Sequence, residues 1–385
     1  MENLEKIFEE TYNTKPTLKY ISPARINLIG EHIDYNGGMV LPAAISRYIT
    51  ALVSKRDDDL LCFKSTAFEK VEKRHLSDLK FNPKYDWANY GFGIFYMLIK
   101  EGYRIEKGLN ILITSNIPLG SGLSSSASFL NLIGFIANDV YEFGFDMKTI
   151  ASRSVEVENK YCGLKCGIMD EAAIALGEKD KCLLLNCDNF TYKLVNLNLG
   201  KYKFVVLQTN KPRKLTESKY NERVDECQKS LKLLKEVYKD IHNLCDLRSD
   251  KLDEIKEILN DDILFKRVRH CITENERVYA FKDALEKGNI TKIATLLDLS
   301  HKSLKEDYEV TGLHLDTIVE AAKASKAIAS RMTGAGFGGC AIALVDEDKF
   351  DKFKEKTAKL YFEKTNIIPD IYMVDIVSGP KKIEE

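Results

Sequence analysis

The spacing of apolar and polar residues predicts both helices and strands along the chain. Apolar residues recur every three or four positions in four segments, which predicts amphipathic helices over 4–13, 220–244, 273–289 and 315–329. Thr273 is the expected N-cap and Gly288 the expected C-cap of the third helix. Short β-branched or apolar runs predict strands at 47–57, 182–187, 202–210, 340–346 and 371–377, and another within 107–120. This mixture of elements predicts an α+β fold.

Length and composition restrict the classes of protein to which this chain can belong. Its 385 residues exceed what one core usually serves, so two domains are expected, residues 1–190 and 191–385. The formal net charge of −1 gives no basic excess for binding nucleic acid or an anionic membrane. No apolar run reaches the roughly 18 residues of a membrane span, and the acidic N-terminal segment is unlike a signal peptide. We expect a cytoplasmic protein that is a monomer, although the sequence does not exclude an oligomer.

The nine cysteines are scattered and odd in number, which favours reduced thiols in the cytoplasm. Four of them raise the alternative of a zinc site: Cys162, Cys166, Cys182 and Cys187. Their spacing is loose and two of them flank a predicted strand, so structural zinc is disfavoured.

A loop rich in glycine and serine precedes an apolar, helix-like segment. Gly120, Gly122 and four serines lie within the seven residues 120–126. A helix N-terminus has unpaired N–H groups and a partial positive charge, and glycines let a bulky anion approach the backbone. The loop therefore suits a phosphate group, although no lysine stands where a P-loop has one. A serine-rich helix cap over a glycine turn explains the same residues, and both interpretations stay open.

A second glycine cluster occupies residues 333–340. Gly334, Gly336 and Gly339 match the spacing of a dinucleotide-binding fingerprint, which follows a strand and opens a helix. Here a helix is predicted before the cluster and a strand after it, so a Rossmann fold is disfavoured. The alternatives are a loop whose backbone approaches a ligand and a plain helix-to-strand turn.

Polar residues crowd the segment 22–45. Arg25, Glu31, His32, Asp34 and Asn36 lie within twelve residues, and Gly37 and Gly38 follow them. Such donors and acceptors suit a ligand with many hydroxyl groups, and an ordinary solvated loop is the alternative.

Asp170 follows a small, apolar segment and precedes a helix-like one. An acid in this place is either a helix cap or a catalytic carboxylate, and the residues alone favour the cap.

Taken together, these segments resemble a galactokinase, of the galacto-, homoserine, mevalonate and phosphomevalonate kinase superfamily. The sequence RINLIGEHIDYNGG at 25–38 resembles the galactokinase signature, and CGIMDE at 166–171 resembles the catalytic segment. PLGSGLSSSAS at 118–128 and TGAGFGGC at 333–340 resemble the phosphate loop and the C-terminal glycine loop of the superfamily. The resemblance extends from about Tyr20 to the C-terminus.

The resemblance implies a role for individual residues. Asp170 is implied as the general base at the anomeric hydroxyl of the sugar, and Arg25 as the group between Asp170 and the phosphates. The residues implied for the sugar are Glu31, His32, Asp34, Gly167, Asp170 and Tyr220. Those implied for ATP are Trp87, Asn89, Gly120, Ser121, Gly122, Leu123, Ser124, Ser125, Ser126, Gly334, Gly336 and Gly338. Those implied for Mg²⁺ are Ser125 and Glu158.

The implied fold has two α+β lobes with the active site between them, and the implied reaction is ATP-dependent phosphorylation of galactose at its anomeric hydroxyl. Ala24 stands where the family usually has glycine, and Ile33 where it usually has threonine. These departures leave open a related sugar such as N-acetylgalactosamine. A further alternative is a galactokinase-like sensor that binds sugar and ATP without phosphoryl transfer; the intact serine loop, Asp170 and Arg25 argue against it.

Overall fold

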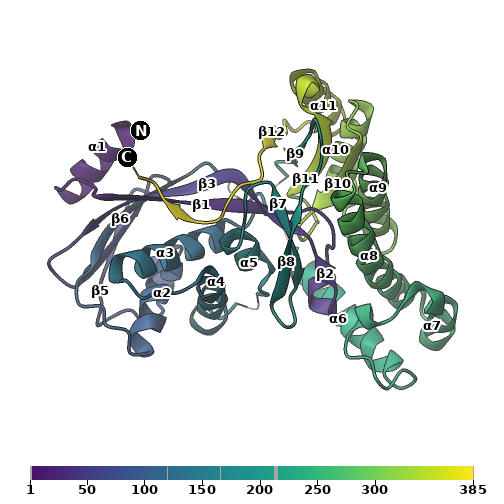
Figure 1. Ribbon diagram of the computed structural model, residues 1–385, viewed down its shortest axis with the longest axis horizontal. Coiled ribbons are helices and arrows are strands. Elements are labelled where there is room, and N and C mark those ends of the chain that lie inside the picture. Colours follow the sequence, from purple (N-terminus) through teal and green to yellow (C-terminus); the bar gives the residue numbers. More distant parts are fainter. Residues whose placement is uncertain (1, 119, 165, 212–215, 385) are drawn as a thin grey trace.

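The computed structural model describes residues 2–118, 120–164, 166–211 and 216–384 and contains two lobes (Figure 1). The N-terminal lobe is built on a six-stranded sheet with the order β13-β1-β3-β6-β4-β5. Its strands are β1 (Leu18–Asn27), β3 (Pro42–Lys55), β4 (Leu60–Ser65), β5 (Val71–His75), β6 (Leu109–Ser115) and β13 (Lys381–Lys382). All neighbours in this sheet are antiparallel except β4 and β6.

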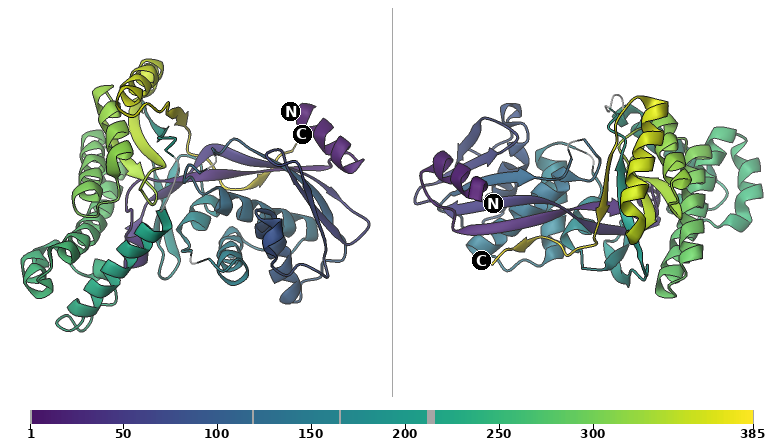
Figure 2. Two further views of the ribbon diagram at one scale, coloured as in Figure 1. Left: turned by 180° about the vertical axis from the view of Figure 1, so that it is seen from behind. Right: turned by 90° about the horizontal axis from the view of Figure 1, so that it is seen from above.

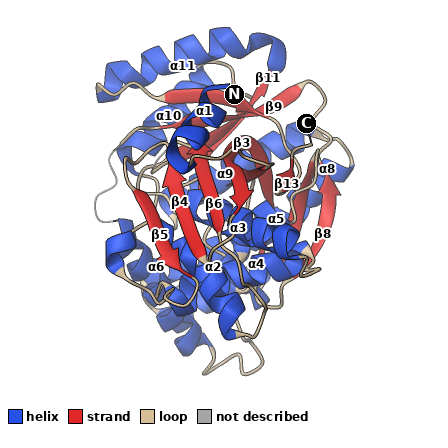
Figure 3. Ribbon diagram, turned by 90° about the vertical axis from the view of Figure 1, so that its left-hand side faces the viewer, coloured by secondary structure: helices blue, strands red, loops and turns tan. Residues whose placement is uncertain are grey.

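Helices cover both faces of this sheet. The helices on one face are α2 (Ala88–Lys100), α3 (Ser125–Tyr141), α4 (Met147–Glu156) and α5 (Met169–Ala175). Helix α1 (Glu2–Tyr12) lies on the opposite face, as Figures 1 and 3 show. Side chains alternate along β3, so that Ala51 and Val53 join the main core while Leu52 packs with Phe8 of α1.

A three-stranded antiparallel sheet with the order β2-β7-β8 lies beside the large one. Its strands are β2 (Met39–Val40), β7 (Lys181–Asn186) and β8 (Thr191–Asn196). The β7–β8 hairpin spans residue 190. The domain boundary near this residue therefore falls at the turn of one hairpin, and it stays a prediction.

The C-terminal lobe has an antiparallel sheet with the order β10-β11-β9-β12. Its strands are β9 (Tyr202–Gln208), β10 (Ala329–Thr333), β11 (Cys340–Asp346) and β12 (Asp370–Val374). Its helices are α6 (Thr216–Leu234), α7 (Leu252–Leu259), α8 (Asp262–Glu286), α9 (Ile290–Glu306), α10 (Gly312–Ala324) and α11 (Phe350–Thr365). The chain then returns to the first lobe, where β13 pairs with β1 and the two termini lie near each other (Figure 2).

The predicted α+β class and two-lobed architecture are confirmed, and the strand at 340–346 has the predicted bounds. The predicted helix 273–289 is wrong at its start, because α8 begins at Asp262 and the carboxylate of Asp261 caps it. The Thr273 hydroxyl instead bonds back to the carbonyl of Arg269 inside the helix. Gly288 does follow the helix end, with a φ of +60°.

Two other helices are shorter than predicted. Helix α6 ends at Leu234 and not at 244, and a separate turn with a capping box of Asn243 and Asp246 follows at Leu244–Asp246. Helix α10 ends at Ala324 and not at 329, where β10 begins. The second glycine cluster therefore connects two antiparallel strands, and the prediction that a helix precedes it is wrong. None of the helices in the described ranges is long and apolar enough to cross a membrane.

Candidate active site

Arg25 and Asp170 meet at the centre of the site although 145 residues separate them in the sequence. Arg25 lies on β1 and Asp170 in the first turn of α5. The guanidinium donates from Nε to Oδ1 at 2.8 Å and from Nη2 to Oδ2 at 2.7 Å, a two-pronged contact that fixes both groups. Its Nη1 also donates to the carbonyl oxygen of Gly122 at 2.8 Å. This bond connects the pair to the glycine and serine loop at 120–126, called the first glycine loop below.

Asp170 does not cap a helix, so the interpretation that the residues alone favoured is wrong. Ile168 occupies the N-cap position of α5, and no side chain caps it. The Asp170 carboxylate instead accepts bonds from Arg25 and from the hydroxyl of Ser124. A carboxylate has about four acceptor positions, so these three bonds leave room for one more donor.

The first glycine loop presents a helix N-terminus to the same point. Ser124 is the N-cap residue of α3, with a φ of 60°, but its side chain makes no capping bond. Its hydroxyl bonds to Asp170 instead. The serine-cap interpretation therefore fails at this residue, and among the described residues the N-cap side chain leaves the first N–H groups of α3, at the positive end of the helix dipole, uncapped.

A cavity of about 280 Å³ opens beside these groups. It is lined by Arg25, Glu31, His32, Asp34, Ser126, Ala127, Glu158, Cys166, Gly167, Met169, Asp170, Glu171, Tyr220, Gly334 and Ala335. The structure thus brings together all six residues predicted for the sugar, which come from both lobes. Carboxylates, an imidazole and a phenol in one cavity offer the hydrogen-bonding groups that a hydroxyl-rich ligand needs.

Glu31 is held from the C-terminal lobe. Its Oε1 accepts from the N–H of Gly334 at 2.9 Å and from the hydroxyl of Thr333 at 3.1 Å. Its Oε2 lies 2.5 Å from Nη2 of Arg331, which is fully buried. Burial raises the pKa of Glu31, and the charge of Arg331 opposes that rise.

Asp34, Gly167 and Tyr220 form another part of the cavity wall. Burial raises the pKa of the Asp34 carboxyl to about 7, and the nearby charge of Asp170 acts in the same direction. A hydroxyl donor bound in the cavity would favour the ionised form of Asp34 and oppose this rise.

His32 has both ring nitrogens in hydrogen-bonding contact. Nε2 lies 3.1 Å from the carbonyl oxygen of Ala335, and Nδ1 lies 2.9 Å from the hydroxyl of Tyr35. Burial lowers the pKa of His32 to about 3, so the ring is neutral. His32 therefore lines the cavity as predicted, but its position is fixed by protein groups.

The first glycine loop and the second glycine loop, which is the cluster at 333–340, approach each other across the lobes. A Cβ on Gly334 would lie 3.6 Å from the carbonyl oxygen of Gly122, and the Cys340 thiol donates to the carbonyl of Ser121 at 3.2 Å. Gly336 has a φ of +78°, and a Cβ there would lie 2.3 Å from the carbonyl oxygen of Val310. Only glycine fits at that position without displacing the neighbouring backbone.

Two buried glutamates, Glu158 and Glu171, lie on the cavity wall near Asp170. Oε2 of Glu171 has no hydrogen-bond partner among the described residues, and burial and the charge of Glu158 raise its pKa. Hard cations such as Mg²⁺ prefer carboxylate and hydroxyl oxygens, so this donor set fits Mg²⁺. Ser126 reaches the cavity wall, whereas Ser125, the residue predicted for the metal, is exposed at the start of α3 and does not.

Trp87 and Asn89 do not line the cavity. Trp87 stacks on Phe68 and packs against Phe129 of α3, the helix that follows the first glycine loop. Asn89 is buried, and its side chain bonds to the backbone of Asn82. Trp87 therefore packs beside α3, and the contact of both residues with ATP stays a prediction.

The two departures from the family's sequence pattern lie outside the cavity. Ala24 is buried in β1, where a register shift against β3 occurs between Pro23 and Ala24. Ile33 is fully buried beside Gly38. Neither side chain is therefore in a position to contact a ligand in the cavity.

The sequence predictions missed Arg331, Tyr35 and Tyr308. Arg331 lies in the buried strand that precedes the second glycine loop, where a charged residue among apolar ones could have signalled a partner. The aromatic rings of Tyr35 and Tyr308 lie 6.0 Å and 4.9 Å from the ring of His32. Tyr35 belongs to the signature segment, but nothing near Tyr308 in the sequence indicates its place beside His32.

Comparison with known proteins identifies the class to which this fold and site belong. Residues 89–178 match the family model of the N-terminal domain of GHMP kinases, and residues 281–362 match that of their C-terminal domain. The fold also resembles a mevalonate kinase with a TM-score of 0.68 at 23% identity, covering 94% of this chain and 100% of that one. Both lobes thus match models of the GHMP kinases, a class of ATP-dependent small-molecule kinases.

Further matches identify the branch within this class. Residues 6–55 match the galactokinase galactose-binding signature. The chain is 43% identical to the galactokinase of Enterococcus faecalis over 98% of each chain, and 43% identical to that of Clostridium acetobutylicum over 99% of this chain and 98% of the relative. The Lactococcus lactis galactokinase complexed with galactose superposes with a TM-score of 0.93 at 40% identity, covering 99% of both chains. The chain belongs to the galactokinase family.

Proposed function

We propose that this protein transfers the terminal phosphoryl group of ATP to the anomeric hydroxyl of galactose, giving galactose 1-phosphate and ADP. The observation that carries the proposal is the contact between Asp170 and Arg25 beside the first glycine loop. It places a carboxylate with one acceptor position to spare next to a helix N-terminus that suits phosphate. Phosphoryl transfer needs such positioning and charge stabilisation more than covalent chemistry.

In this proposal Asp170 accepts the hydrogen of the anomeric hydroxyl and orients its oxygen towards the terminal phosphorus. Arg25 holds the carboxylate in place and stabilises negative charge that develops during transfer. The other hydroxyls of the sugar bind to the groups of Glu31, His32 and Asp34, together with Gly167 and Tyr220.

The phosphates of ATP bind to the backbone of the loop 120–126 at the start of α3, and the loop that contains Gly334, Gly336 and Gly338 closes over them. Glu158 and Ser125 would hold Mg²⁺. When bound, Mg²⁺ would neutralise phosphate charge and polarise the transferred group. The monomeric state and the cytoplasmic location stay predictions of the sequence.

The experiment that tests the function is a coupled ADP-release assay with a panel of hexoses. Galactose should support turnover, and its epimer glucose should give a kcat/KM at least about a hundredfold lower, because the wrong epimer leaves buried polar groups unpaired. A higher kcat/KM with N-acetylgalactosamine than with galactose would mean that N-acetylgalactosamine is the substrate. Binding of sugar and ATP with no ADP release for any hexose would mean that the protein is a sensor and not an enzyme.

An Asp34→Ala variant is expected to bind galactose about tenfold to a hundredfold more weakly, because a hydrogen bond to a charged carboxylate is lost. Asp34 lines the cavity but belongs to neither glycine loop proposed for ATP, so the KM for ATP should stay close to the wild-type value. Isothermal titration with galactose, together with KM values for both substrates, measures the effect. An unchanged affinity for galactose would remove Asp34 from the sugar site.

A further inference from the structure

We propose that Tyr308 is a positioning residue for the sugar site, and that it acts through a one-directional chain of hydrogen bonds that holds the His32 ring in place. The inference rests on the proposed galactose kinase function and adds a residue that contacts no substrate in that proposal. It starts from three contacts: Tyr35 Oη lies 2.9 Å from Nδ1 of His32, Tyr308 Oη lies 2.9 Å from Tyr35 Oη, and Cys227 Sγ lies 3.1 Å from Tyr308 Oη.

The direction of the chain follows from its end at Ala335. The carbonyl oxygen of Ala335 can only accept, so Nε2 of the neutral His32 ring carries the hydrogen and Nδ1 must accept. The hydroxyl of Tyr35 therefore donates to Nδ1, which leaves its oxygen to accept from Tyr308. Tyr308 then has no hydrogen left, and the thiol of Cys227 donates to it.

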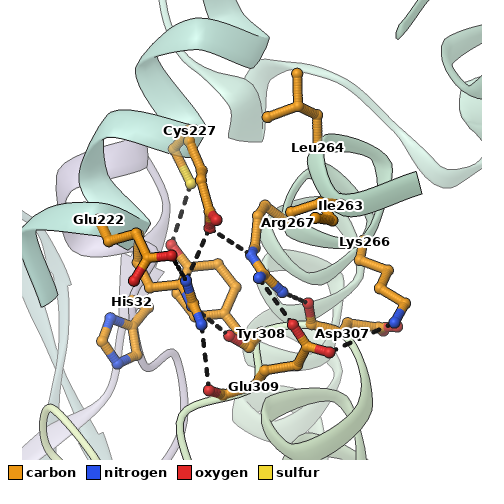
Figure 4. Close-up of polar contacts among 12 residues, drawn as sticks. His32, Glu222, Cys227, Ile263, Leu264, Lys266, Arg267, Asp307, Tyr308 and Glu309 are labelled. Carbon is orange, nitrogen blue, oxygen red and sulfur yellow. Dashed lines mark hydrogen bonds and ion pairs between the residues drawn. The ribbon is translucent and has the colours of Figure 1, made fainter. Parts of the chain in front are cut away.

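Ion pairs hold the backbone around Tyr308 in place. The fully buried Arg267 of α8 donates to the carbonyl of Asp307 at 2.5 Å and to the carboxylate of Glu309 at 2.8 Å. Arg223 of α6 donates to the carbonyl of Tyr308 at 2.8 Å. Figure 4 shows Arg267 beside Asp307 and Glu309, and the contact between Cys227 and Tyr308. Tyr308 is therefore fixed by two helices while its ring lies against His32.

The same segment supports the second glycine loop. The N–H of Phe337 donates to the carbonyl of Val310 at 2.7 Å, and this carbonyl is the group that excludes a side chain at Gly336. Residues 307–310 thus contact both the sugar signature, through His32, and the glycine loop proposed for ATP. Nε2 of His32 donates to the carbonyl of Ala335, and both residues line the cavity.

A Tyr308→Phe variant tests the proposal because it removes one hydroxyl and keeps the ring. Tyr35 then loses the hydrogen bond that holds its hydroxyl beside Nδ1 of His32, so its bond to this nitrogen weakens. We expect an about tenfold higher KM for galactose, as the loss of one buried hydrogen bond predicts, and a kcat within about twofold of wild type. We also expect ¹⁵N NMR of labelled protein to show a shifted His32 Nδ1 resonance in the variant, while the carbonyl of Ala335 keeps the ring in its Nε2–H tautomer.

Tyr20→Phe is the matched control, since Tyr20 is also fully buried. Its hydroxyl donates to Asp139 at 2.6 Å and takes no part in the hydrogen bonds that lead to His32. It should leave the KM for galactose and the His32 Nδ1 resonance unchanged. Tyr35→Phe should reproduce the effect of Tyr308→Phe, and the double variant should add little to either. A KM equal to that of the control, or an unshifted His32 Nδ1 resonance, would overturn the proposal. The NMR measurement needs no turnover, so it decides the inference even if galactose is not the substrate.

Discussion

An Asp170→Asn variant is expected to bind galactose with near-normal affinity and to turn it over at least about a hundredfold more slowly, since a positioned base contributes roughly 10²- to 10⁴-fold. The amide keeps the shape of the carboxylate but cannot accept a proton. It also has one acceptor atom where Arg25 now donates to two oxygens, so the two-pronged contact is lost. Single-turnover phosphoryl transfer and equilibrium galactose binding, measured on the same preparation, separate the two effects.

Asp139→Asn is a matched control for this experiment. The Asp139 side chain is 33% exposed and pairs with Lys382, while that of Asp170 is 32% exposed and pairs with Arg25. Because Asp139 lies outside the cavity, its variant should keep wild-type turnover. Near-normal activity of Asp170→Asn would refute the assignment of the base.

The parts of the site that could be predicted from the sequence are those in which several functional residues are close together along the chain. The signature segment contributes Arg25, Glu31, His32 and Asp34 to one cavity, and the glycine-serine loop does begin a helix. In such segments the local backbone decides where the side chains go. The resemblance to galactokinases then indicated that Asp170 belongs to the same cavity.

Contacts between distant segments could not be derived from periodicity or spacing. The residues around Asp170 favour a helix cap, and only the fold shows that Arg25 and Ser124 use its carboxylate. The pairing of Tyr308 with Tyr35 joins positions 273 residues apart. Such contacts depend on how the lobes pack, which no local pattern encodes.

One error of element type had a local cause. Residues 315–329 are rich in alanine and continue the helical spacing, so helix propensity extended the prediction across the start of β10. Tertiary packing decides otherwise, because β10 pairs with β11 along its whole length. The missed strand contains Arg331 and Thr333, both of which contact Glu31. For this reason the sequence did not show that residues of the C-terminal lobe contact Glu31 in the sugar site.

An Arg331→Met variant is expected to lower the free energy of unfolding by about 3–5 kcal/mol at neutral pH, because it leaves Glu31 buried without its cation. Arg331 is 0% exposed, contacts Glu31 at 2.5 Å and donates to the carbonyl of Leu28 at 2.7 Å across the lobes. Urea unfolding followed by circular dichroism measures the loss. Arg74→Met is the control, because Arg74 is also buried but its partner Asp78 is 74% exposed. Removing Arg74 leaves no buried charge without a partner, so the loss of unfolding free energy should be much smaller.

The pH dependence of this loss of unfolding free energy distinguishes a buried charge without a partner from a simple packing defect. Burial raises the pKa of Glu31 above that of the unfolded chain, and removing Arg331 raises it further. The folded variant then holds a proton that the unfolded chain releases above about pH 4.3, so its stability falls as the pH rises through this window. The cost of Arg331→Met should therefore be smaller at pH 5 than at pH 8, and adding Glu31→Gln should recover part of it at pH 8. An equal cost at both pH values would mean that Arg331 contributes packing and not charge compensation.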